Sequence, residues 1–69
     1  MTTELGSDEL IESAYAAYAD PLLRWLTGST RDRSAAEDIT QEAFVRLVIE
    51  VRSGRVPDET GAWLFRVAQ

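Results

Sequence analysis

The sequence has no cysteine, no histidine and no lysine. Without cysteine it has neither a disulfide nor a thiolate ligand for a metal, and without histidine most nucleophile–base pairs and the usual zinc, copper and haem sites are excluded. No glycine-rich phosphate loop is present either. We therefore predict a protein that is not an enzyme and that has no catalytic residues, metal site, cofactor or small-molecule ligand.

Signal-peptide features and long apolar runs are also missing. No stretch resembles a secretory signal, and no apolar run approaches the length of a membrane span. The absence of both predicts a protein with no membrane association. The lack of cysteine fits a reducing, cytoplasmic compartment.

Charge is unevenly distributed along the 69 residues, which are enough for one small domain. The net charge is −5, and five acidic residues precede the first arginine at Arg24. From there on, acidic residues and arginines balance. Because phosphate neutralisation drives non-specific DNA binding, an acidic chain is a poor candidate for it and a better one for a basic protein partner.

Apolar residues recur at helical spacing after a short start, residues 1–7, that is predicted to be a flexible tail with Ser7 as N-cap. The stripe comprises Leu10, Ile11, Ala14, Tyr15, Tyr18, Leu22, Trp25 and Leu26. It predicts a helix over residues 8–27, kinked at Pro21 but continuous because the stripe keeps its phase. Tyr15, Tyr18 and Trp25 are interpreted as core aromatics rather than as a ligand site.

Two further helices follow. Residues 28–33 are typical of a turn, and Ser34 with Glu37 matches a capping box that begins a helix over residues 34–52, ended by Gly54. After a polar loop, Thr60 is a candidate cap for a third helix over residues 60–69, which we expect to be truncated at Gln69. No strand pattern is present, so residues 8–69 are predicted to form a small all-α, three-helix domain.

The helix over residues 34–52 has two distinct faces. One is an ordinary core face, and its apolar residues are Ala36, Ile39, Ala43, Phe44, Leu47, Val48 and Val51. The opposite face carries Asp38, Gln41, Glu42, Val45 and Ile49. Exposed β-branched residues gain little in a helix, which favours a docking surface, although a solvated face with two aliphatic residues is the alternative. Asp38 and Glu42 lie one turn apart on a convex face, which argues against an acid–base pair.

Two motifs in this order resemble a known family. Tyr15-x-x-Tyr18 is followed by Ala36-Glu37-Asp38-Ile39-Thr40-Gln41-Glu42-Ala43-Phe44 and then by Ala62-Trp63-Leu64-Phe65-Arg66-Val67-Ala68. The combination is similar to the second conserved region of bacterial RNA polymerase sigma factors, in the short form of the extracytoplasmic-function (ECF) group, over residues 10–69. A generic helical adaptor unrelated to transcription explains the periodicity equally well but not the co-occurrence of both motifs.

The resemblance implies a specific role for the second helix. In such proteins the Asp-x-x-Gln-Glu helix docks on the clamp coiled coil of the largest catalytic subunit of the core RNA polymerase. Asp38, Gln41 and Glu42 would then pair with clamp arginines, and Val45 and Ile49 would add apolar contacts.

The resemblance also implies other partners and a missing continuation. The family's next segment, which melts the promoter minus-ten element, and the domain that binds the minus-thirty-five element would both be absent after Gln69. Promoter DNA would be a partner of the full-length protein, and an anti-sigma factor would be a second one, covering the docking face and apolar surface left by the short third helix. Arg55 is a candidate phosphate contact, with a solvated loop arginine as the alternative, whereas Trp63 and Phe65 are predicted core residues rather than stacking platforms.

Overall fold

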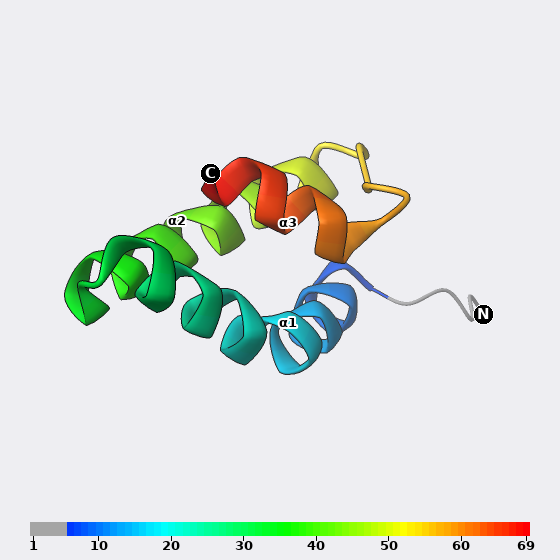
Figure 1. Ribbon diagram of the computed structural model, residues 1–69. Coiled ribbons are helices and arrows are strands. Elements are labelled where there is room, and N and C mark those ends of the chain that lie inside the picture. Colours follow the sequence, from blue (N-terminus) through cyan, green and yellow to red (C-terminus); the bar gives the residue numbers. More distant parts are fainter. Residues whose placement is uncertain (1–5) are drawn as a thin grey trace.

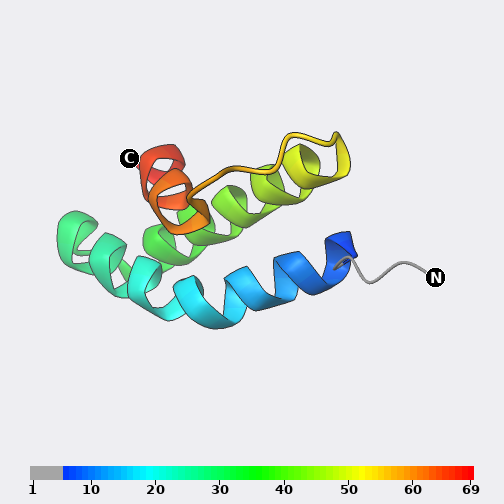
Figure 2. The ribbon, with the colours of Figure 1, turned by 90° about the vertical axis from the view of Figure 1, so that its right-hand side faces the viewer.

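The computed structural model describes residues 6–69 and contains three helices, α1 (Ser7–Thr30), α2 (Arg33–Arg52) and α3 (Thr60–Ala68). Figure 1 shows α1 and α2 as the two long elements, with α3 packed beside them. In Figure 2, α1 and α2 are seen lengthwise and α3 nearly end-on, so α3 lies across the long pair. The predicted all-α, three-helix fold is confirmed, with no strand among the described residues.

Helix α1 begins one residue earlier than predicted. Ser7 is its first residue rather than its cap, and Gly6 is the N-cap. The Gly6 N–H donates to Glu9 Oε1 at 3.1 Å, so Glu9 satisfies one of the free amides at this end. A flexible tail was predicted for residues 1–7. Residues 1–5 lie outside the described part, Gly6 is the N-cap and Ser7 belongs to the helix.

Pro21 lies inside α1 and does not end it. A proline removes one backbone hydrogen bond, but the apolar stripe continues in phase on both sides, so packing against α2 holds the helix together. Continuity through Pro21 is confirmed, while the kink at this residue stays a prediction.

The connection from α1 to α2 is shorter than predicted. The helix runs on to Thr30, Arg31 adopts the left-handed conformation with φ 58°, and Asp32 already caps α2. The Ala35 N–H donates to Asp32 Oδ1 at 3.2 Å. The predicted capping box of Ser34 and Glu37 is therefore wrong, because Asp32 occupies the cap position and Glu37 instead accepts a hydrogen bond from Arg33 Nε at 3.2 Å.

Glycine ends α2 as predicted. Ser53 is the C-cap, and Gly54 follows with φ 85°, a conformation that residues with a Cβ adopt only with strain. The next helix begins at Thr60, so Thr60 is not its cap as predicted. Glu59 holds the N-cap position without a side-chain hydrogen bond.

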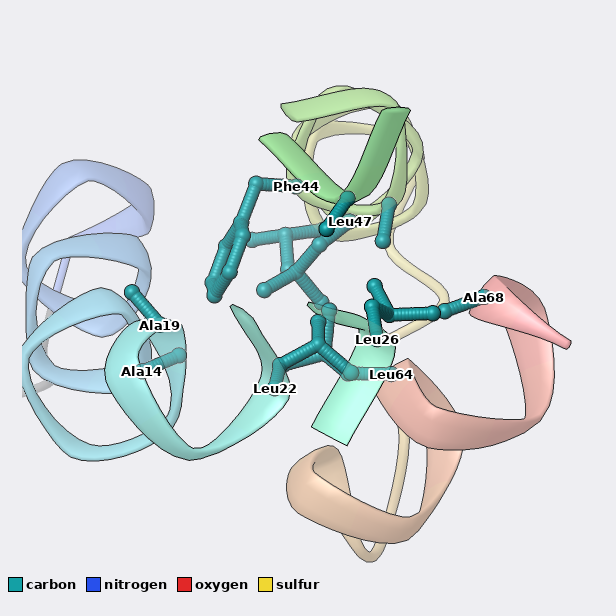
Figure 3. Packing of buried hydrophobic residues seen from close by; sticks show 11 residues of the cluster. Ala14, Ala19, Leu22, Leu26, Phe44, Leu47, Leu64 and Ala68 are labelled. Atoms are coloured by element: carbon teal, nitrogen blue, oxygen red, sulfur yellow. The ribbon is translucent and has the colours of Figure 1, made fainter. Parts of the chain in front are cut away.

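The core lies where the three helices meet (Figure 3). Its fully buried large side chains are one leucine from each helix, Leu22, Leu47 and Leu64. Small residues such as Ala36 and Ala43, which are 0% and 1% exposed, allow the helices to approach closely. The other buried hydrophobic residues are Ala14, Ala19, Leu26, Phe44, Val51 and Ala68. Ile39, Tyr18, Trp63 and Phe65 are partly buried against this core.

Two aromatic residues predicted for the core are on the surface. Tyr15 is 58% exposed, with its ring edge on Phe44 at a centroid distance of 5.0 Å. Trp25 is 40% exposed and packs on Phe65 at 5.2 Å. Both predictions are wrong for the same reason: a small three-helix domain cannot cover the whole width of the α1 stripe, so its margins stay open to solvent.

Candidate protein-docking surface

The exposed residues of α2 include the five that were predicted for docking, which we call the outer strip: Asp38, Gln41, Glu42, Val45 and Ile49. Val45 and Ile49 are among the exposed large hydrophobic residues of the described part, at 53% and 55%. They lie one helical turn apart, as do Asp38 and Glu42. The structure thus brings together all five residues that the sequence predicted for docking.

Helical register fixes which residues reach this surface. Ala36, Ala43 and Leu47 face the core at 0–1% exposure, which turns residues half a turn away toward solvent. Thr40 sits among the buried positions, where its hydroxyl donates to the Ala36 carbonyl at 2.8 Å. Because this hydrogen bond stays within α2, the Thr40 hydroxyl can be buried without a hydrogen-bond partner from another helix.

The carboxylates of the outer strip border an apolar groove between α2 and α3. Asp38 and Glu42 line a hollow of about 320 Å³ together with Ile39, Ala43, Arg46 and Val67. Two carboxylates above an apolar floor suit a long basic side chain, whose stem packs on carbon while its charged end meets the carboxylates. Val67 was not singled out from the sequence, which predicted an open apolar surface on the third helix without naming its residues.

Glu42 already has a neighbour of opposite charge. Arg46 Nε lies 3.7 Å from Glu42 Oε2, one turn further along α2, and both side chains are largely exposed. Exposed pairs of this kind contribute only about 0–1 kcal/mol, so a partner's arginine can replace Arg46 at little cost.

Arg55, the candidate phosphate contact, is held by the protein itself. Its Nε donates to Glu50 Oε1 at 2.8 Å and its Nη2 donates to Glu50 Oε2 at 3.4 Å. The hydrogen bond and the charge of Glu50 raise the pKa of Arg55 above its already high ordinary value. A phosphate would have to compete with this carboxylate, which weakens the case for Arg55 as a nucleic-acid contact.

Residues 6–69 form neither a metal site nor a membrane-spanning helix. Over this range no group of three acidic, histidine or cysteine residues is arranged to hold a metal ion. None of the three helices is both long enough and apolar enough to cross a membrane.

Comparison with known proteins places the chain in a family. A family model described as sigma-70 region 2 matches residues 14–69. The ECF RNA polymerase sigma factor SigM of Bacillus subtilis (strain 168) is 36% identical over 59 residues, or 86% of this chain and 36% of that relative. The chain thus spans little more than a third of the relative's length. No solved structure gave a significant match.

The family-model match includes the motifs on which the resemblance was based, since residues 36–44 and 62–68 lie within its range. The resemblance to the second region of ECF sigma factors is confirmed. Because the family model covers most of the sequence, the chain belongs to the sigma-70 region 2 family.

Proposed function

We propose that this domain is the polymerase-docking part of an ECF sigma factor, a promoter-specificity subunit that performs no catalysis. The observation that carries the proposal is the outer strip of α2, where Asp38, Gln41 and Glu42 lie beside exposed Val45 and Ile49. Family membership supplies the class of process, which is transcription initiation.

The proposed partner is the clamp coiled coil of the largest subunit of the core RNA polymerase. Carboxylates bind arginine with short, charge-assisted hydrogen bonds, and Gln41 adds an amide that both donates and accepts. Val45 and Ile49 supply apolar area beside the polar groups, and apolar anchors of this kind carry much of the binding energy of protein interfaces. The acidic net charge of −5 favours fast encounter with a basic partner.

Further partners follow from the same proposal. In the full-length protein, promoter DNA would be bound and its minus-ten element melted with the help of segments beyond this domain. An anti-sigma factor would inhibit the protein by covering the outer strip. The site of action would be the bacterial cytoplasm, where the polymerase works.

The experiment is binding of this chain to a purified clamp coiled-coil fragment, measured by calorimetry beside the double variant Asp38→Arg, Glu42→Arg. We expect saturable binding that the variant loses by at least about 100-fold, because two attractive pairs become repulsive. A matched control, Glu12→Arg with Asp58→Arg, changes the net charge equally at exposed positions outside α2 and should bind within about threefold of the original chain.

Circular dichroism must show that all three proteins are equally helical. If the folded chain does not bind, or if the control variant loses as much affinity as the outer-strip variant, the docking proposal is wrong. A generic helical adaptor would then be the better interpretation.

A further inference from the structure

Among the described residues, Arg46 is the only basic one that lines the hollow between α2 and α3, which it shares with the carboxylates of Asp38 and Glu42. These three residues follow one another at four-residue intervals, so their side chains lie in one row along α2. The rest of the lining is apolar and comes from both helices. A positive charge of the chain itself therefore lies at the place where a basic side chain of the proposed partner would bind.

The contact of Arg46 with Glu42 is the longest of the four ion pairs in the described part of the chain. Arg46 Nε lies 3.7 Å from Glu42 Oε2, too far for a hydrogen bond. The other three pairs, at 2.8–3.2 Å, are all hydrogen-bonded, and none of their residues lines the hollow. Because the long pair is also exposed, Arg46 can leave Glu42 at little cost to the fold.

Arg46 acts on an incoming basic side chain in two ways. It shares the Glu42 carboxylate, which the incoming group must take over, and its positive charge repels a second positive charge in the same hollow. Both effects are local, because salt at about 0.1 M screens exposed charges beyond roughly 10 Å. Arg46 therefore lowers the attraction of the hollow for a basic group, while the second carboxylate, that of Asp38, keeps this attraction favourable.

We infer that Arg46 is an intramolecular competitor of the clamp's basic side chain, and that its contact with Glu42 lowers the affinity of docking. This inference rests on the proposed function, since it takes the clamp coiled coil as the partner. In the free domain Arg46 offsets part of the negative charge of the hollow, and docking displaces it from Glu42. The affinity is then lower than the two carboxylates alone would give.

The test is a calorimetric titration of the clamp coiled-coil fragment with the original chain, with Arg46→Gln and with the control Arg33→Gln. Both substitutions lower the net charge by one and break an exposed pair with a glutamate four residues away on α2, but Arg33 does not line the hollow. We expect Arg46→Gln to bind about three- to tenfold more tightly than the original chain, and Arg33→Gln to stay within about twofold of it.

A second variant, Arg46→Met, separates release of the carboxylate from other effects. Methionine also removes the charge, but its end is apolar. Equal gains in both Arg46 variants that disappear in about 1 M salt, where charges are screened beyond about 3 Å, would support the inference. A gain with methionine alone would assign the effect to an apolar contact and overturn it, as would a gain that persists in 1 M salt.

Failure of this inference and failure of the docking proposal give different results. If the original chain binds and Asp38→Arg, Glu42→Arg does not, docking stands. An Arg46→Gln affinity no higher than that of Arg33→Gln then overturns the inference alone, and a lower one would mean that Arg46 itself contacts the clamp. If no chain binds although circular dichroism shows all of them to be equally helical, both the docking proposal and the inference are wrong.

Discussion

Both faces of α2 carry aliphatic residues, but these residues have different surroundings. The inner face places Ala36, Ala43 and Leu47 at 0–1% exposure against α1 and α3, while the outer face leaves Val45 and Ile49 more than half exposed. Aliphatic residues on the inner face are explained by the core they build. Those on the outer face contribute little to the stability of the isolated fold. The docking proposal explains them as contacts to a bound partner protein.

Under the docking proposal, one helix serves both the fold and the function. Burial fixes the inner face, and helical register then fixes which residues the outer face presents. A substitution on one face should therefore change stability, and on the other it should change binding.

The largest expected effect separates the two faces directly. Leu47→Asp places a charge at a fully buried position and should destabilise the domain by more than about 4 kcal/mol, enough to unfold it. Val45→Asp makes the same chemical change at an exposed position and should cost less than about 1 kcal/mol. Thermal denaturation followed by circular dichroism measures both. Equal losses of stability would contradict the assignment of the two faces.

A smaller effect tests how closely α3 packs on α1. A Cβ at Gly61 would lie 2.6 Å from Tyr18 Cε1, so Gly61→Ala must displace the ring and should cost about 1–3 kcal/mol. Gly28→Ala is the control, because nothing lies within 4 Å of the added methyl and alanine favours a helix by about 1 kcal/mol. Urea denaturation should show one variant less stable and the other more stable than the original chain. A stable Gly61→Ala variant would mean that α3 does not pack closely on Tyr18.

The start of α2 sets the register of both faces and can be tested through its cap. Asp32→Ala removes the side-chain oxygen that accepts the Ala35 N–H and should cost about 1 kcal/mol of unfolding free energy. Ser34→Ala should cost less than about 0.5 kcal/mol, because Ser34 lies inside the helix. A larger loss for Ser34→Ala than for Asp32→Ala would instead support the capping box of Ser34 and Glu37.

The smallest effect on stability is expected on the outer strip. Val45→Ala and Ile49→Ala should each change the free energy of unfolding by less than about 0.5 kcal/mol, since alanine's higher helix propensity offsets the small loss of packing. Each should nevertheless weaken binding to the clamp fragment by about tenfold, an effect of about 1.4 kcal/mol measured by calorimetry. Unchanged affinity in both variants would show that the exposed aliphatics have no part in docking.

Much of the fold could be predicted because the core residues of α2 recur at helical spacing along a single face. The pattern that placed Ala43 and Leu47 inward also placed Val45 and Ile49 outward, and the structure has them there. The apolar stripe of α1 is wider, so its spacing alone does not tell which aromatics are covered. Tyr15 and Trp25 lie at the margins, where coverage depends on the packing of the other helices rather than on local sequence.

Helix ends were harder to predict because neighbouring residues compete for the cap. Asp32 and Ser34 both suit an N-cap, and the choice depends on Arg31, whose left-handed conformation ends α1 just before Asp32. Two hollows between α1 and α2 were not predicted either, since the apolar spacing of each helix does not show which exposed side chains of the two helices lie side by side.

The most direct measurement of the central claim is a titration of the isotope-labelled chain with the clamp coiled-coil fragment, recording amide and methyl NMR signals. The account predicts that the perturbed signals centre on the outer strip, with the methyl groups of Val45 and Ile49 changing most, while those of Leu22 and Leu64 stay unchanged. Perturbation centred on α1 or on the loop after α2, or no perturbation of a folded chain, would contradict it.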